Sequence, residues 1–298
     1  YIGSILVPKL LKHGFKVTVI DNFRYHQTSL LEHCKNKKLE IIRGDARNES
    51  LIKQQLKSAE AIFPLACLTG APLSSSDPAG AKTINFDAVK MIVELKSKNQ
   101  LLIFPSTQSV YGHQTEICTE ETMPSPLSLY SSLKVDAEKV ISSSKNWILF
   151  RLATVFGLSP RMRLDLLVNN FTYKALYDKF IVLFEAKFKR DYVYIGDVAD
   201  AFIFCLKDFI KLKEEIYNIK LSNVNLTKKE LCEEIKKQIP NFVYLESPIG
   251  EDPDKRDYIV SSKKIENKGF KAKTSIDHGI AELIKGYQII KVNEYSNF

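Results

Sequence analysis

The stretch that decides the fold is residues 101–112, which read LLIFPSTQSVYG. Its first four residues form a short apolar run, which predicts a buried strand of a parallel sheet. The polar residues that follow lie where this strand ends, and open α/β sheets place their ligands at the carboxyl ends of their strands. The stretch therefore predicts both an architecture and the position of a site.

A helix is predicted shortly afterwards, over residues 127–140, because two prolines precede an apolar pattern of helical period. Tyr130 and Lys134 are four residues apart, so they share one face of this helix. A lysine ammonium beside a tyrosine favours the phenolate and lowers the pKa of the phenol. With the hydroxyl of Thr107, this pair could move a proton on or off a carbinol while a cofactor exchanges the hydride. Thr107, Tyr130 and Lys134 are the catalytic candidates, and the alternative is an ordinary surface helix.

Composition narrows the class of protein. The chain has 298 residues, 45% of them apolar and 26% charged, which suits a soluble protein with one large core or a core and a smaller lobe. No apolar run approaches the roughly 20 residues that span a bilayer, so no membrane contact is predicted. The five cysteines are scattered, which predicts reduced thiols, a cytoplasmic location and no metal site.

The net charge of +8 suggests an anionic partner. Lysines alternate with glutamates along the predicted helices, which is typical of solvated faces rather than of a nucleic-acid surface. We therefore expect no nucleic-acid partner, and a substrate that carries a diphosphate fits the clustered arginines better.

The first residues predict half of a dinucleotide-binding unit. A helix over 5–13 ends at Gly14, and a strand over 15–20 leads into Asp21. Gly3 is interpreted as the last glycine of the turn that precedes this helix. The first strand is not visible, so we expect about a dozen residues to precede Tyr1, and a gap between the strands at 15–20 and 61–65. A true start at Tyr1 is the alternative.

Asp21 indicates which dinucleotide would bind. A carboxylate that closes this strand accepts hydrogen bonds from the ribose hydroxyls and repels a 2′-phosphate, which favours NAD over NADP. The alternative for Asp21 is a simple turn residue. Arg24 lies nearby and keeps NADP open.

Segments 105–134, 147–157 and 189–199 resemble the extended short-chain dehydrogenase/reductase family of nucleotide-sugar epimerases and dehydratases. The resemblance implies an α/β fold, with a Rossmann-type doubly wound parallel sheet over 1–157 and a smaller C-terminal α/β substrate lobe over 158–298. Residues 190–220 would return to the Rossmann core. It also implies a homodimer, through helices at about 83–98 and 127–144 that pair with their copies.

The same resemblance implies the residues that bind ligands. One departure is Pro64, which stands where the family usually has a histidine. NAD would contact Ile2, Gly3, Asp21, Asn22, Asp45, Ala46, Leu65, Ala66, Cys67, Asn85, Tyr130, Lys134 and Ala153. The nucleotide-diphosphate sugar would contact Ser109, Arg161, Arg163, Asn169, Arg190 and Arg256.

Departures from the family motifs narrow the reaction. Gln108 and Ser109 follow Thr107, whereas 4,6-dehydratases have Asp-Glu there and the fucose-forming epimerase-reductases have a cysteine at the second position. What is left is hydride and proton transfer at one carbon, usually C4. Stretches 151–169 and 250–258 resemble enzymes that oxidise C4 of GDP-D-glycero-manno-heptose in capsule polysaccharide biosynthesis. A GDP-heptose-type 4-dehydrogenase is therefore predicted, with a UDP-glucose 4-epimerase-like enzyme or a non-catalytic NAD-binding subunit as alternatives.

Overall fold

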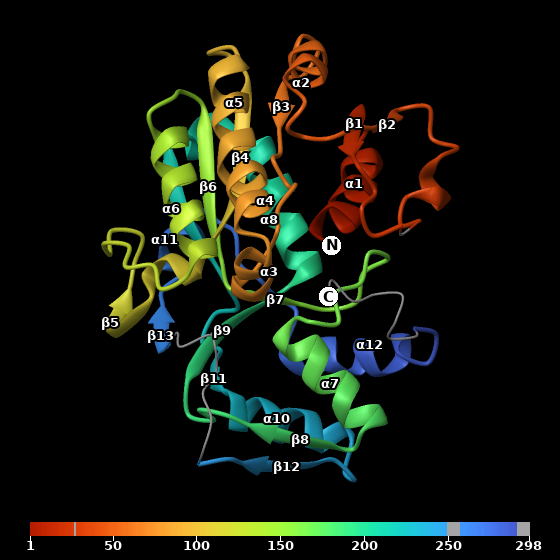
Figure 1. Cartoon of the computed structure of the whole chain (residues 1–298), viewed down its shortest axis with the longest axis vertical. Helices are drawn as coiled ribbons and strands as arrows, with labels where there is room; N and C mark the ends of the chain where they lie inside the picture. Colours follow the sequence, from red (N-terminus) through yellow and green to blue (C-terminus); the bar gives the residue numbers. More distant parts are fainter. Residues whose placement is uncertain (27, 249–256, 291–298) are drawn as a thin grey trace.

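A computed structural model gives the fold and describes residues 1–26, 28–248 and 257–290 (Figure 1). The main sheet contains β3 (Ala61–Ile62), β4 (Leu101–Thr107), β6 (Trp147–Leu152) and β10 (Glu215–Ile219). Its strands are parallel and lie in the order β10-β6-β4-β3. The predicted parallel α/β architecture is therefore confirmed, with the predicted strand at 101–104 at the centre of the sheet.

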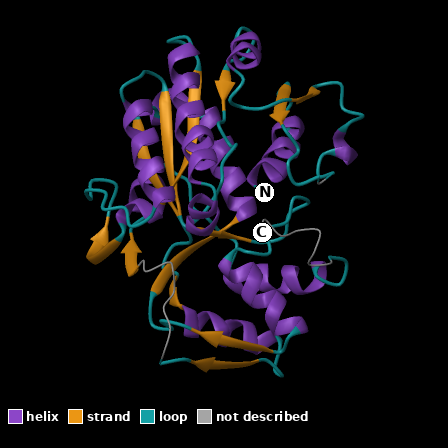
Figure 2. Ribbon diagram, in the orientation of Figure 1, coloured by secondary structure: helices purple, strands orange, loops and turns teal. Residues whose placement is uncertain are grey.

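The apolar run of β4 is continuous because both faces of the sheet are covered. Leu102 and Phe104 pack into one core cluster with α5 (Ala88–Leu95) and α6 (Leu129–Ser142). Ile103 points to the opposite face and belongs to the cluster that includes α1 (Ile2–Lys12) and α8 (Ile195–Lys207). Figure 2 shows these helices on the two sides of the strands. Burial on both faces is what a near-continuous apolar strand predicts.

β1 (Val17–Asp21) and β2 (Leu39–Arg43) form a two-stranded parallel sheet of their own. Among the described residues neither strand pairs with β3, so the predicted gap between the strands at 15–20 and 61–65 is confirmed. Figure 1 shows this pair set apart from the main sheet, beside α1. Helix α1 attaches to α8, where the Lys9 ammonium donates to the backbone oxygen of Gly196 at 2.9 Å.

The clearest departures from the predicted elements lie in two segments. The strand predicted at 61–65 ends at Ile62, and Pro64, which has no backbone N–H to donate, lies in the loop that follows. The helix predicted at about 83–98 is divided into a π-helical turn (Thr83–Asp87) and α5, and α4 (Pro78–Lys82) precedes it. Such π-turns are frequent at functional sites, and this one contains Asn85.

The second lobe lies below the main sheet in Figure 1 and is built on smaller sheets. β7 (Thr154–Phe156), β9 (Lys189–Tyr194) and β11 (Asn225–Thr227) form one sheet, β8 (Phe180–Leu183) pairs with β12 (Val243–Glu246), and β5 (His113–Cys118) pairs with β13 (Asp257–Val260). The other helices are α2 (Glu49–Leu56), α3 (Ala71–Ser76), α7 (Leu167–Tyr177), α9 (Phe209–Leu212), α10 (Lys228–Gln238), α11 (Lys263–Asn267) and α12 (Ile276–Gly286). In the described part of the chain, no helix is both long and apolar enough to cross a membrane.

Candidate active site

The carboxyl end of β4 forms the first part of the site. Thr107 is the last residue of the strand, and a 3₁₀ turn over Gln108–Tyr111 follows it. The Thr107 Oγ1 accepts a hydrogen bond from the Ser109 backbone N–H at 3.1 Å and lies 2.8 Å from the Ser109 Oγ. Gly112 ends the turn with φ +69°, and a Cβ there would lie 1.9 Å from the Ser125 carbonyl oxygen. Only glycine lets these two backbone segments approach so closely.

Helix α6 supplies the second part. Ser128 caps the helix, and its side chain and that of Ser131 form a reciprocal capping box. This start places Tyr130 in the first turn and Lys134 one turn later. The Lys134 ammonium donates to the Pro105 carbonyl oxygen at 2.8 Å, and its Nζ lies 6.0 Å from the centroid of the Tyr130 ring. The structure thus brings the tyrosine and lysine of α6 to the strand end that carries Thr107.

Two of the predicted substrate arginines lie beside this edge. Arg163 forms a buried ion pair with Asp165 and donates to the Thr69 carbonyl oxygen at 3.4 Å. Arg161 stacks on Tyr25, with its guanidinium carbon 4.3 Å from the ring centroid. Burial, together with the like charge of Arg163, lowers the pKa of Arg161. A bound anion would relieve that repulsion, so the pair suits the predicted diphosphate contact.

The other predicted substrate contacts are placed differently. The Asn169 side chain is fully buried and braces the chain: it accepts from the Gly157 N–H at 3.0 Å and donates to the Arg163 carbonyl oxygen at 2.9 Å. Arg190 is 2% exposed in β9 and donates to the Lys189 carbonyl oxygen at 2.9 Å. Arg256 lies outside the described residues.

Asp21 lies at the end of β1 and is exposed to solvent. Its Oδ1 accepts from the Phe23 backbone N–H at 2.7 Å, and the Asn22 Oδ1 accepts from the Arg24 N–H at 3.0 Å. The Asp21 carboxylate therefore stabilises the turn that follows β1. The turn also fixes the carboxylate, whose other oxygen makes no hydrogen bond within the described residues. An oriented, exposed carboxylate at this strand end fits the ribose hydroxyls of NAD.

The loop after β3 contains three more predicted cofactor contacts, Leu65, Ala66 and Cys67. Buried Asn85 holds this loop: its amide accepts from the Leu68 N–H at 2.8 Å and donates to the Leu68 carbonyl oxygen at 3.0 Å. Both ends of the Asn85 side chain are engaged, so its effect on a cofactor would act through the loop. Asn85 lies within the π-helical turn.

The remaining predicted cofactor residues vary in how well they fit. The Asp45 carboxylate pairs with Arg47 at 2.6 Å, which lowers the pKa of that carboxyl and leaves it less available to NAD. A Cβ on Gly3 would meet Leu65 at 3.5 Å, an ordinary contact, so close packing does not require glycine there. The other three lie at the ends of elements or in the turns between them. Ile2 begins α1, Ala46 follows Asp45 in the turn after β2, and Ala153 lies between β6 and β7.

Gln108 is a residue whose part in the site the sequence did not reveal. It was interpreted only as the lack of an acid, yet its side chain is fully buried between Thr107 and Ser109. Neither amide atom has a hydrogen-bond partner among the described residues. An unsatisfied buried polar group costs about 1–3 kcal/mol, so this amide is a candidate partner for a ligand. An amide between two hydroxyl residues at a strand end is the signal that could have identified it.

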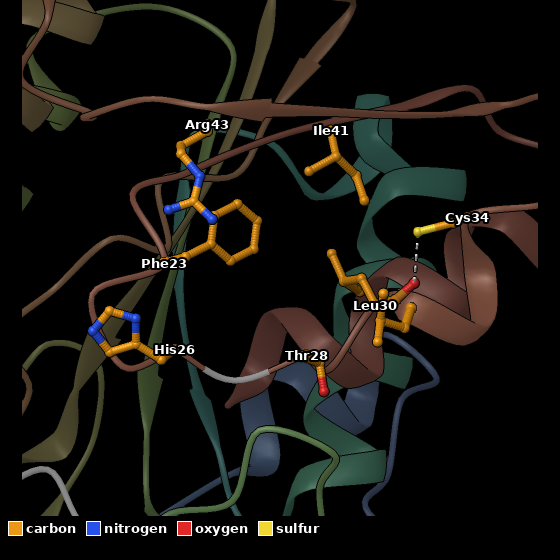
Figure 3. A pocket seen from close by; sticks show the side chains of 8 residues that line it. Phe23, His26, Thr28, Leu30, Cys34, Ile41 and Arg43 are labelled. Carbon is orange, nitrogen blue, oxygen red and sulfur yellow. Dashed lines mark hydrogen bonds between the residues drawn. The ribbon is translucent and has the colours of Figure 1, made fainter.

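A cavity of about 280 Å³ lies apart from this chemistry, between the loop that follows Asn22 and strand β2 (Figure 3). In it the Arg43 guanidinium carbon lies 5.1 Å from the centroid of the Phe23 ring. The lining is mostly apolar and includes none of the predicted site residues: Phe23, His26, Thr28, Leu30, Leu31, Cys34, Ile41 and Arg43.

Comparisons with known proteins agree with this arrangement. Residues 1–219 match the NAD dependent epimerase/dehydratase family. A putative UDP-glucose 4-epimerase of Methanocaldococcus jannaschii is 27% identical, over 95% of this chain and 94% of its own length. UDP-glucuronic acid decarboxylase 1 of Arabidopsis thaliana is 26% identical, over 99% of this chain and 69% of its own. The structure of a Bacillus cereus UDP-glucuronic acid 4-epimerase has a TM-score of 0.85 at 22% identity, covering 97% of this chain and 96% of that one.

The chain belongs to the NAD dependent epimerase/dehydratase family. The predictions of a Rossmann-type α/β fold, of an enzyme and of NAD as cofactor are confirmed at this level. The narrower prediction, the GDP-heptose 4-dehydrogenase branch, is not confirmed.

Removing the charge of Asp21 is expected to change cofactor choice. Asp21→Asn keeps an acceptor for the Phe23 N–H, so the turn survives, whereas the charge that repels a 2′-phosphate is lost. Hydrogen bonds to a charged group contribute about 1.5–3 kcal/mol, so we expect NAD to bind about 10-fold or more weakly and NADP to gain relative to NAD. Fluorescence titration with both cofactors measures this. Asp136→Asn, on exposed surface of α6, is the control, and an unchanged NAD/NADP ratio would leave Asp21 a turn residue only.

Proposed function

We propose that this protein is an NAD-dependent enzyme that oxidises C4 of a nucleotide-diphosphate sugar and completes a 4-epimerisation, with UDP-hexoses as the first substrates to test. The observation that carries the proposal is the group formed by Thr107 and Ser109 at the end of β4 and by Tyr130 and Lys134 on α6. No carboxylate directly follows Thr107 along the chain, so this group offers proton transfer at a carbinol and no built acid–base pair for eliminating water. The names of the M. jannaschii and B. cereus relatives support a 4-epimerase.

Each residue has a defined task in this proposal. Thr107 holds the C4 hydroxyl, and Tyr130 takes its proton and later returns it. Lys134 is fixed on the Pro105 carbonyl oxygen, where its charge favours the ionised phenol. Bound NAD would supply the hydride transfer at the carbinol carbon. Asp21 and the loop at 65–67 would hold the NAD. Arg161 and Arg163 would bind the diphosphate.

A 4-dehydrogenase that releases a keto sugar is the second candidate. It is favoured by the resemblance of residues 151–169, which contain Arg161 and Arg163, to the GDP-heptose-oxidising branch. The second segment of that resemblance, 250–258, lies mostly outside the described residues. The two candidates use the same side chains and differ in whether the keto sugar leaves before it is reduced again.

A substrate screen separates them. The protein is incubated with NAD and with UDP-, GDP- and dTDP-linked hexoses and GDP-heptose, and products are identified by NMR and mass spectrometry. A 4-epimerase yields the C4 epimer with no net NADH, whereas a 4-dehydrogenase yields a keto sugar and one NADH for each turnover. Loss of water or of carbon dioxide from the sugar would contradict both candidates, and no turnover would favour a non-catalytic NAD-binding subunit.

Gln108→Met tests whether the buried amide serves the substrate. Methionine has a similar volume and no polar atom to satisfy, so the free energy of unfolding should stay the same or rise by up to about 1–3 kcal/mol. If a sugar hydroxyl is the missing partner, KM should rise about 5-fold or more. Urea denaturation and initial rates measure the two effects, with exposed Gln54→Met as the control. A loss of stability with unchanged KM would make Gln108 a structural residue.

We also propose a homodimer, although the structure leaves less apolar surface for its interface than the two helices offer in sequence. Most apolar residues of the two helices that the resemblance places at the interface are buried inside the protein itself. Val89, Ile92, Ala137 and Ile141 pack against the sheet, and Leu133 packs against α3 and α4. Val93 and Val140, on the same two helices, keep part of their surface exposed. We expect light scattering at micromolar concentration to give the mass of two chains, and Val140→Lys to reduce it to one. A single-chain mass for the unaltered protein would refute the dimer.

We also propose a cytoplasmic location. All five cysteines are free thiols in the structure, and burial raises the pKa of Cys118 to about 11. Unpaired cysteines are typical of proteins in a reducing compartment.

A further inference from the structure

Hydrogen bonds connect strand β4 to helix α6 at two consecutive residues of the strand. The Pro105 carbonyl oxygen accepts from Lys134, and the Ser106 hydroxyl donates to the Glu138 carboxylate. Lys134 and Glu138 are one turn apart on α6. Two successive turns of the helix are therefore held by the two residues that immediately precede Thr107.

A third element supports this junction. The register of the sheet pairs Arg151 of β6 with Ser106 of β4, and both reach the same carboxylate. The Arg151 Nη2 lies 2.8 Å from the Glu138 Oε2, and its Nε lies 3.3 Å from each carboxylate oxygen. The two side chains are 3% and 6% exposed. A buried, charge-assisted contact of this kind holds its partners in a defined geometry.

The same arginine also holds the far side of the Thr107 turn. Its Nη1 donates to the Tyr111 hydroxyl oxygen at 3.1 Å and to the Glu120 carbonyl oxygen at 3.2 Å. The Tyr111 hydroxyl in turn donates to the Asn218 Oδ1 at 2.8 Å. Arg151 is thus connected, through Glu138 and Ser106 on one side and Tyr111 on the other, to both ends of the segment that contains Thr107.

We propose that Glu138, held by Arg151 and Ser106, is a positioning residue that sets the distance between the Tyr130 phenol and the Thr107 hydroxyl. It touches no substrate and acts by fixing α6 against β4. A misplacement of about 1 Å between reacting groups can cost about 100-fold in rate. A small shift of α6 relative to β4 would therefore lower kcat. This inference rests on the proposed acid–base role of Tyr130.

A substitution of Ser106 tests this proposal with the least damage to the fold, because the ion pair between Glu138 and Arg151 remains when the serine hydroxyl is lost. The matched pair Ser106→Thr and Ser106→Val adds the same bulk and differs only in the hydroxyl. We expect kcat of the valine variant to be about 10-fold or more below that of the threonine variant, while KM for the sugar and the Kd of NAD differ by less than about twofold. Asp136→Asn, exposed on the same helix, is the control. Equal kcat for the threonine and valine variants overturns the proposal.

A double-mutant cycle shows whether the effect passes through Tyr130. In a Tyr130→Phe background, the difference between threonine and valine at position 106 should fall to less than about twofold, because no phenol is left to be positioned. An undiminished difference would mean that Ser106 acts on something else, and it overturns the positioning role alone. If Tyr130→Phe itself keeps the unaltered rate, the acid–base assignment fails and the positioning role fails with it, so the two failures are told apart.

Discussion

Tyr130→Phe is expected to abolish most turnover while NAD binds almost as before. Phenylalanine keeps the ring in its buried position on α6, so the only loss is the hydroxyl that moves the proton. General acid–base groups contribute about 100- to 10,000-fold to rate, so we expect kcat to fall at least about 100-fold. Initial rates with the nucleotide sugar that gives the fastest turnover, and a fluorescence titration with NAD, measure the two quantities.

The control for this substitution is Tyr244→Phe, which removes a hydroxyl from β12 in the second lobe. It should leave both kcat and NAD affinity unchanged. If Tyr130→Phe keeps more than a tenth of the original rate, Tyr130 is not the acid–base group. A large loss of NAD affinity would instead indicate that the phenol serves the cofactor more than the sugar.

Arg151→Met is expected to cause a large loss of stability. It leaves the Glu138 carboxylate buried without its charged partner, and breaking a buried ion pair in this way costs about 3–5 kcal/mol. Typical total stabilities are about 5–15 kcal/mol, so a substantial fraction of the folding free energy would be lost. Urea denaturation measures it. Lys139→Met, which removes an exposed ion pair 3.5 Å long, should cost less than about 1 kcal/mol.

A second substitution identifies the source of that loss. Adding Glu138→Gln to Arg151→Met removes the unpaired charge while keeping a group that can accept from Ser106. The double variant should therefore be more stable than Arg151→Met alone. If instead the two losses simply add, the buried charge is not the cause, and lost packing of the arginine side chain would explain the result.

The sequence predicted the centre of this fold because its pattern there is unambiguous. Residues 101–104 are apolar without alternation, as a strand covered on both faces must be, and Tyr130 and Lys134 share a helix face by spacing alone. Bounds were wrong where a local feature overrides a pattern. Ala61 begins a strand that pairs over only two residues, and Asn85 lies in a π-helical turn inside what looked like one helix.

Other features depend on tertiary contacts that periodicity does not encode. An apolar stripe shows that a helix face is buried but not against what. Ala137 and Ile141, on a helix expected to pair with its copy, pack against the sheet. The pair Glu138 and Arg151 was not foreseen at all. Charged residues on a helix and a strand meet only once the register of β4 and β6 is known, and that register places Arg151 beside Ser106.

The separation of β1 and β2 from the main sheet has a consequence for motion. A two-stranded sheet is marginally stable by itself, whereas β4 and β6 lie inside a sheet covered on both faces. Local opening costs less free energy where fewer buried contacts are broken, so the amide protons of β1 and β2 should exchange with solvent faster than those of β4 and β6. Within residues 1–298, the part that carries Asp21 would then open locally more often than the part that carries Tyr130. A cofactor that bound Asp21 would slow this exchange, and part of its binding free energy would go into ordering the strand pair.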